Sequence, residues 1–165
     1  MSEPSPRGPQ RNLELLERLH DGGVHFCIVG GVAAVLHGAT RMTVDLDIAA
    51  PFDEGNLQRL VDVLRSLDAR HATRPELRVV DEPIERLAKF RMLVVETTLG
   101  RLDVLPEVPP LGGFDQLSTV VLDVGARATR VLALEQLIAV KRALRRPKDV
   151  EVAIELEAIR KALDV

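Results

Sequence analysis

The chain has 165 residues, a net charge of −3 and 46% hydrophobic residues, a composition typical of one globular domain rather than a disordered segment. Four Phe and no Trp or Tyr exclude the base-stacking surface of a single-strand nucleic-acid binder, and the acidic balance excludes a generally basic one. The single cysteine, Cys27, can form neither an internal disulfide nor a thiolate metal cluster, so we expect a cytoplasmic protein. No apolar run approaches the roughly 20 residues that span a bilayer, and no membrane partner is expected.

The predicted elements alternate between helices and strands, which indicates an α/β (α+β) fold with a mixed sheet. Prolines near the start predict a flexible N-terminal tail over residues 1–11, followed by a single domain over residues 12–165. Hydrophobic periodicity predicts helices over 12–21, 32–36, 57–67, 84–88, 134–144 and 147–163. The apolar and alternating segments predict strands over 24–29, 43–49, 90–98, 101–105, 120–124 and 128–132. The segment 32–36 is apolar on every side, which predicts a buried helix.

Three carboxylates stand out in this pattern. Asp45 and Asp47 are two residues apart on an expected strand, so their side chains share one face while aliphatic neighbours bury the other. Neighbouring carboxylates repel each other unless a cation lies between them, and Mg²⁺ is the hard cation of phosphoryl chemistry. A solvated strand face is the alternative for an isolated Asp-x-Asp pair. Asp103, alone in a second apolar strand, is the third carboxylate that a two-metal site requires.

Gly30 and Gly31 connect the strand expected at 24–29 to the helix that follows it. This arrangement allows a phosphate to approach bare backbone N–H groups at the start of the helix. Gly-Gly pairs also occur in plain turns, and we expect such turns at 22–23 and 112–113. The informative feature is the order: a strand, Gly-Gly, a helix, and a strand that carries two carboxylates.

The block IVGGVAAVLHGATRMTVDLDI resembles the signature of the nucleotidyltransferase superfamily that includes DNA polymerase β. The resemblance implies a nucleotidyltransferase-like mixed β-sheet flanked by helices, with two C-terminal helices at 134–163. It also implies that Gly30 and Gly31 bind the triphosphate and that Asp45, Asp47 and Asp103 are the catalytic ligands of Mg²⁺. Many members carry Ser after the first Gly, and Gly31 lacks the hydroxyl with which that Ser touches phosphate.

Within this superfamily the chain is most similar to the nucleotidyltransferase toxins of abortive-infection systems (AbiEii-type) and their small relatives. The similarity lies in the Arg-x-Thr-x-Asp-Leu-Asp stretch that begins at Arg41 and in the ending LEQLIAVKRALRRPKDVEVAIELEAI. We therefore expect Arg41 and Thr43 to bind nucleotide, with a structural role as the alternative for both.

Lys141 lies in the middle of the apolar stripe of the helix expected at 134–144. Its ammonium either extends past the stripe into solvent or points into a polar cleft and pairs with triphosphate oxygens. The matching position in the toxin-like families favours nucleotide binding. For Asp149 we expect a helix-capping role, with a contact to Lys141 or an arginine as the alternative, and for His37 a packing role.

Together these residues predict a Mg²⁺-dependent enzyme that transfers an NMP from an NTP to a hydroxyl with release of pyrophosphate. The resemblance implies a toxin-like enzyme that acts on tRNA or protein and has a cognate antitoxin as partner. A small antibiotic as acceptor is the alternative. The rival from another class is a non-catalytic relative that binds a nucleotide or a protein partner. The sequence predicts neither the preferred NTP nor the oligomeric state.

Overall fold

The computed structural model describes residues 10–40 and 45–164. Its helices are α1 (Asn12–Asp21), α2 (Gly30–Leu36), α3 (Glu54–Ser66), α4 (Ile84–Leu87), α5 (Leu134–Leu144) and α6 (Pro147–Leu163). Its strands are β1 (Cys27–Val29), β2 (Leu46–Ala49), β3 (Arg70–His71), β4 (Arg74–Arg78), β5 (Leu93–Thr97), β6 (Gly100–Leu105), β7 (Glu107–Val108), β8 (Gly112–Gly113), β9 (Thr119–Val124) and β10 (Arg127–Leu132).

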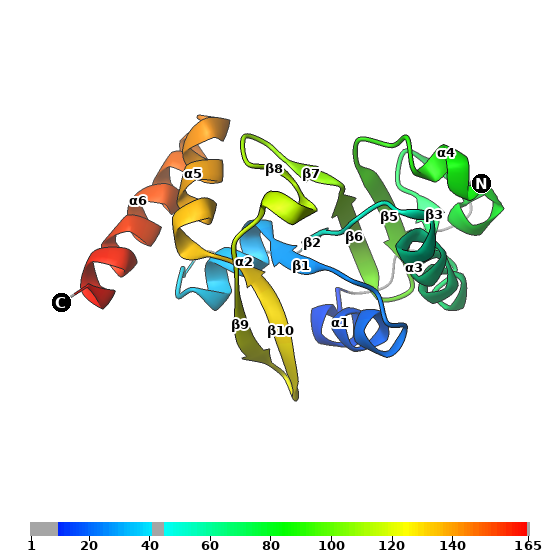
Figure 1. The fold of residues 1–165 in the computed structure, drawn as a ribbon, viewed down its shortest axis with the longest axis horizontal. Coiled ribbons are helices and arrows are strands. Elements are labelled where there is room, and N and C mark those ends of the chain that lie inside the picture. Colours follow the sequence, from blue (N-terminus) through cyan, green and yellow to red (C-terminus); the bar gives the residue numbers. More distant parts are fainter. Residues whose placement is uncertain (1–9, 41–44, 165) are drawn as a thin grey trace, which may run out of the picture.

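Within the described residues, eight of these strands form one mixed sheet in the order β4-β3-β5-β6-β2-β1-β10-β9. β1 runs parallel to β10 and β2 runs parallel to β6, whereas the other neighbours are antiparallel. β7 and β8 form a separate small hairpin. The predicted mixed sheet with two C-terminal helices is therefore confirmed (Figure 1).

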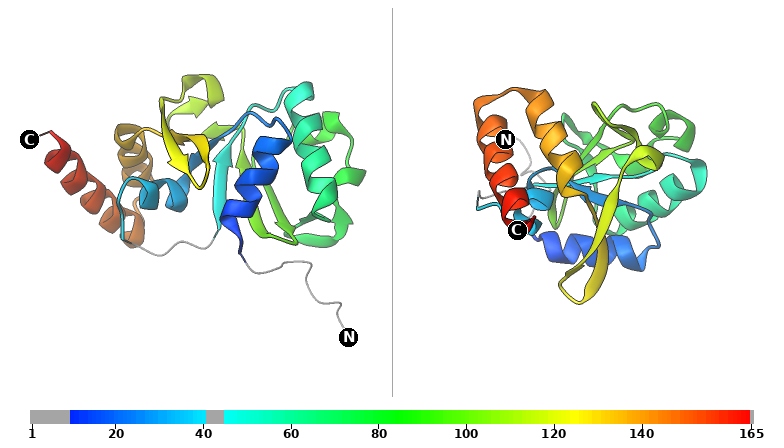
Figure 2. Two further views of the ribbon diagram at one scale, coloured as in Figure 1. Left: turned by 90° about the horizontal axis from the view of Figure 1, so that it is seen from below. Right: turned by 60° about the vertical axis from the view of Figure 1, so that its left-hand side comes forward.

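One part of the hydrophobic core lies on the face of the sheet that α1 and α3 cover (Figure 2), and the buried cluster continues into α2, α5 and α6. Leu19 of α1 and Leu64 of α3 are completely buried, as are the aliphatic residues that alternate along β2 and β6. Each helix turns its leucine stripe inward because leucines three or four residues apart lie on the same helix face. The polar residues that alternate with the buried ones along β2 and β6 therefore face the other side.

α5 and α6 pack side by side at the end of the molecule farthest from α3 (Figure 1). α2 lies between them and the sheet, and it contacts β1, β2 and α5. Only one side of α2 is covered: Ala33 and Ala34 are buried, whereas Val35 is 40% exposed. The prediction of a fully buried helix is therefore wrong, because neighbouring elements do not surround this short helix.

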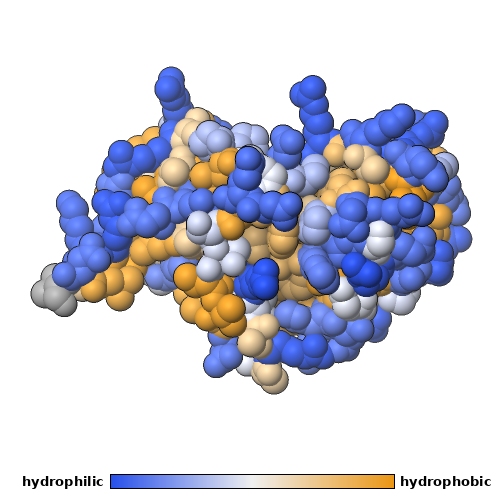
Figure 3. Space-filling view, viewed as in Figure 1, coloured by the Kyte–Doolittle hydropathy of each residue, from blue (hydrophilic) through white to orange (hydrophobic). Residues whose placement is uncertain are grey.

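The two edges of the sheet were predicted with different success. β9 and β10 form the expected pair, and Val120 and Val121 of β9 are exposed. Hydrophobic surface gathers over the region of β9 and β10 (Figure 3). The short strands β3 and β4 at the other edge were not predicted, because two residues show no alternation and β4 is rich in charge. In the described part of the chain, no helix is both long and apolar enough to cross a membrane.

Candidate functional site

Two of the predicted carboxylates face each other across neighbouring strands. Asp47 of β2 and Asp103 of β6 are register partners in the parallel pair, so their side chains emerge next to each other on the same face. The flanking Leu46 and Leu102 are completely buried on the opposite face, which fixes the direction of both carboxylates. Asp45 directly precedes β2 and joins the same group. The structure thus brings together the three acids that the sequence singled out.

Crowding of these acids strongly affects Asp47. Burial, the negative charges of Asp103 and Asp45, and a hydrogen bond with Asp103 raise the pKa of Asp47 from 3.8 to about 7, against the opposing charge of Lys141. A hydrogen bond between two carboxyl groups requires a proton on one of them. When all three acids are ionised, their negative charges repel one another strongly. A cation bound between them reduces this repulsion, so the site favours the binding of cations.

Arg101 is part of this group, and the sequence analysis did not identify it. Its Nε donates a hydrogen bond to Asp103 Oδ1 at 3.0 Å, and its Nη2 donates to Oδ2 at 3.4 Å. The same Nε lies 3.7 Å from Asp45 Oδ2. The hydrogen bond to Asp103 raises the pKa of Arg101 above its ordinary value, so the guanidinium is fully charged. The available signal was its position two residues before Asp103, which places both side chains on one face of β6.

The predicted glycine loop lies against the carboxylates. Gly30 is the first residue of α2 and has φ +68°, a conformation that favours glycine. A Cβ built on Gly30 would lie 2.3 Å from Asp47 Oδ2, far inside van der Waals contact. The structure therefore gives Gly30 a second reason to be glycine: the Asp47 side chain needs this space. Gly31 follows within the same helix.

Lys141 of α5 and Asp149 of α6 form a nearly buried ion pair beside this group. Lys141 Nζ lies 3.5 Å from Asp149 Oδ1, and their side chains are 13% and 3% exposed. The Lys141 ammonium therefore does not extend past the apolar stripe into solvent, and this disfavours the first of the two predicted alternatives. Arg146 Nε donates to the other carboxylate oxygen of Asp149 at 2.5 Å. Asp149 lies in the first turn of α6, as predicted, but no side chain caps that helix, and both carboxylate oxygens face these cations. The alternative, a contact with Lys141 and an arginine, is therefore confirmed.

The remaining predicted residues are placed as follows. His37 Nε2 lies 2.7 Å from the carbonyl oxygen of Leu132, which ties the end of α2 to the end of β10 and agrees with the expected packing role. Cys27 is completely buried and burial raises its pKa to about 11, as expected of an inert core thiol. Arg41 and Thr43 lie outside the described residues.

The donors in this group suit a hard divalent cation. Among residues 10–40 and 45–164, no group of three or more His, Cys, Asp or Glu side chains is arranged so that it could hold a metal ion by itself. Mg²⁺ is commonly held by only one or two carboxylates together with substrate phosphates. The adjacent carboxylates of Asp47 and Asp103, with Asp45 beside them, fit such a partial site, and Lys141 supplies a positive charge nearby.

Comparison with solved structures shows the nucleotidyltransferase fold over almost the whole chain. The lincosamide antibiotic adenylyltransferase LnuA aligns with a TM-score of 0.62 and 17% identity over 93% of this chain and 99% of its own. The antibiotic-resistance factor ANT(2'')-Ia aligns with a TM-score of 0.56 and 16% identity, covering 93% of this chain and 91% of its own.

A nucleotidyltransferase-like protein from Paracoccidioides brasiliensis gives a TM-score of 0.57 at 17% identity, over 87% of this chain and 72% of its own. No family model matches the sequence, and no curated protein is similar to it. At these identities the similarity establishes the fold, whereas the activity must be argued from the site.

Proposed function

We propose that this protein is a Mg²⁺-dependent nucleotidyltransferase that moves an NMP from an NTP to a hydroxyl acceptor and releases pyrophosphate. The observation that carries the proposal is the pairing of Asp47 and Asp103 on adjacent parallel strands, with Asp45 joining them. This group lies in a fold shared with nucleotidyltransferases from end to end. A half-buried carboxylate pair is costly to a protein, and binding a cation is the chemical use that offsets the cost.

The proposed roles follow from what each side chain can do. Asp45, Asp47 and Asp103 would hold Mg²⁺, which neutralises phosphate charge and makes the acceptor hydroxyl more acidic. The acceptor oxygen attacks the α-phosphorus, the bond to the pyrophosphate oxygen breaks, and Asp103 accepts the hydroxyl proton. Lys141 lies close enough to Asp47 to lower its pKa, so its ammonium can also reach a phosphate bound there.

Backbone amides at Gly30 and Gly31 complete the proposed triphosphate site, together with Arg41 and Thr43 from the segment outside the described residues. Gly30 and Asp47 are in direct proximity, so a phosphate at these amides would lie beside the cation that Asp47 holds. Glycine at position 30 would serve both purposes: it leaves space for the Asp47 side chain and leaves the backbone amide open to a phosphate.

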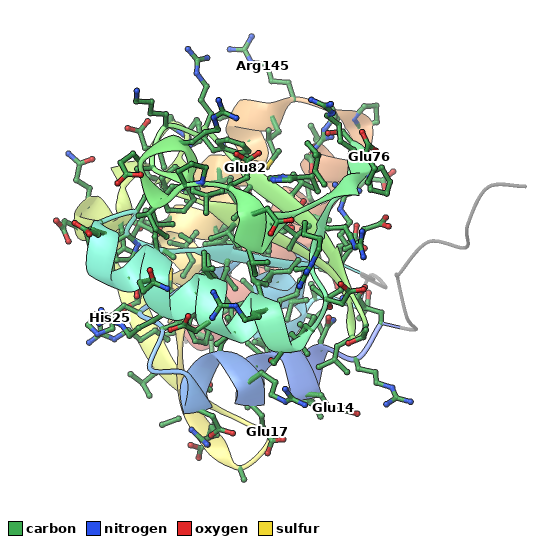
Figure 4. All side chains as sticks on the ribbon, turned by 90° about the vertical axis from the view of Figure 1, so that its right-hand side faces the viewer. Glu14, Glu17, His25, Glu76, Glu82 and Arg145 are labelled. Atoms are coloured by element: carbon green, nitrogen blue, oxygen red, sulfur yellow. The ribbon has the colours of Figure 1, made fainter. Side chains whose placement is uncertain are left out.

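For the acceptor we propose tRNA or protein, as the sequence resemblance to abortive-infection toxins implies, with a cognate antitoxin as partner and a cytoplasmic location. Four basic residues lie in or next to the turn between α5 and α6, namely Arg142, Arg145, Arg146 and Lys148, and Arg145 extends into solvent (Figure 4). Such a local patch suits an RNA backbone even on an acidic protein.

A small antibiotic is the second candidate acceptor, because a specific observation favours it. The chain aligns with 99% of LnuA, which was solved with lincomycin bound, and with 91% of ANT(2'')-Ia, which was solved in complex with adenylyl-2''-tobramycin. Similarity over nearly the full length of two antibiotic-modifying enzymes supports an antibiotic as acceptor here.

The test is a transfer assay with each of the four α-³²P-labelled NTPs, with Mg²⁺ or with EDTA. Total tRNA, a cellular protein extract, lincomycin and tobramycin serve as separate acceptors. We expect Mg²⁺-dependent label on one acceptor class and none with Asp47→Asn. Mg²⁺-dependent NTP binding without transfer to any acceptor would favour the non-catalytic relative. Absence of Mg²⁺-dependent binding to every NTP would refute the proposed function.

A further inference from the structure

Arg101 binds carboxylate oxygens that the proposed function assigns to Mg²⁺. The guanidinium binds Asp103 with two hydrogen bonds, and its Nε also lies near Asp45. A single cationic group thus bridges two of the three acids proposed to hold Mg²⁺. Bidentate pairing of this kind fixes a carboxylate more firmly than a single contact does.

The strand register explains why Arg101 takes this position. Leu46 of β2 is the partner of Leu102, so Asp45 and Arg101 come at the same level one residue earlier. On the other side, Glu96 of β5 is the register partner of Arg101. Acids thus flank Arg101 on both neighbouring strands, and Asp103 follows it on its own strand. Arg101 thus lies among these acids, while Arg70 of β3 is the register partner of Glu96 and Lys141 approaches the group from the side of Asp47.

We propose that Arg101 is a positioning residue: it serves as the internal counter-ion that holds Asp103 and Asp45 in place before metal binding, and a divalent cation then replaces it. The inference rests on the proposed function of this site. Its side chain is 33% exposed, so the guanidinium can swing outward without unpacking the core. The cation that enters must compete with Arg101 for the oxygens of Asp103, which sets the metal concentration at which the site fills.

Two consequences distinguish this role from ordinary strand stabilisation. Without divalent ions, Arg101→Gln leaves the carboxylates uncompensated, so we expect the Tm at pH 8 to fall by about 3–6 °C. With the competitor removed, Mg²⁺ should bind at least about tenfold more tightly, because a positive charge within a few ångströms of a divalent ion opposes it. Mg²⁺ should therefore raise the Tm of the variant more than that of the parent.

The experiment measures Tm and calorimetric Mg²⁺ affinity for the full chain and its variants. Arg78→Gln is the matched control, since Arg78 also lies on a strand and pairs with an aspartate, Asp68 at 3.9 Å, on another part of the sheet. Arg101→Lys keeps the charge but loses the bidentate geometry, and it should fall between the parent and Arg101→Gln. It also serves if the glutamine variant does not fold.

The outcomes separate this inference from the proposed function. If Mg²⁺ stabilises the parent and Arg101→Gln binds Mg²⁺ no more tightly, Arg101 is not the group that the metal replaces, while the proposed function stands. If Mg²⁺ affects neither protein, this inference fails, whereas the proposed function fails only if no NTP binds in a Mg²⁺-dependent way. In the transfer assay, the Mg²⁺ concentration for half-maximal rate should drop by a similar factor in Arg101→Gln, a change that a purely structural role would not produce.

Discussion

Replacing Asp47 with asparagine is the most direct test of the carboxylate group. The folded protein raises the pKa of this carboxyl from 3.8 to about 7, so its ionised form destabilises the folded state. Because the pKa is raised, this penalty is absent below pH 3.8, grows as the pH rises, and is complete above about pH 7. At 1.36 kcal/mol per pH unit, it is on the order of 4 kcal/mol.

Asparagine is uncharged and can donate a hydrogen bond to Asp103, so the variant should avoid most of this penalty at pH 8. Allowing for imperfect amide geometry, we expect a gain of about 1–3 kcal/mol, or about 3–8 °C in Tm, without divalent ions. At pH 5 the folded carboxyl is protonated but the unfolded one is ionised, so only a little more than a third of the full penalty is present, and the gain in Tm should shrink in proportion. Nucleotide transfer should be lost at every pH.

The assay is thermal unfolding of both proteins at pH 5 and pH 8 in EDTA, together with the transfer assay in Mg²⁺. Asp123→Asn is the matched control, because Asp123 is an exposed strand aspartate on β9. A variant that is equally or less stable than the parent at pH 8 would refute the reasoning about charge crowding. Unchanged turnover would refute the catalytic assignment of Asp47.

Three further predictions concern other parts of the site. Gly30→Ala should lose about 1–3 kcal/mol more stability than Gly23→Ala in urea unfolding. Both glycines have positive φ, but only at Gly30 would the added methyl group collide with Asp47. Equal losses in the two variants would contradict this. Lys141→Met should bind NTP about 5- to 150-fold more weakly in calorimetry. An affinity equal to that of the parent would show that the Lys141 ammonium does not bind phosphate. Cys27 should react with a thiol reagent at pH 8 only as fast as the protein unfolds, because burial raises its pKa to about 11; rapid labelling of the folded protein would show that the strand opens.

The sequence predicted those parts of the fold that a single segment specifies by itself. The leucine repeat of α1 and the alternation around Asp47 and Asp103 each define one buried face, so the helix, the strands and the direction of the carboxylates followed from local pattern. β3 and β4 were missed because β3 depends on pairing with β5, and β4 on pairing with β3, rather than on their own residues.

The parts of the site that depend on register or packing could not be predicted. Arg101 contacts Asp45 only because β2 and β6 pair in this particular register. The sequence of neither strand predicts that register by itself. The Asp149 side chain contacts Lys141 because α6 packs against α5. Its place in the first turn of α6 predicted a contact with backbone N–H groups of that helix instead.

The unequal edges of the sheet have a consequence for handling the protein. β4 carries Arg74, Pro75, Glu76 and Arg78, and both its charges and its proline discourage a further strand from pairing there. β9 has exposed Val120 and Val121, no proline, and Asp123 as its single charge. An extended chain from a partly unfolded neighbour can therefore add to β9 but not to β4. Self-association at high concentration should begin at this edge, and a lysine placed on β9 is the natural way to suppress it.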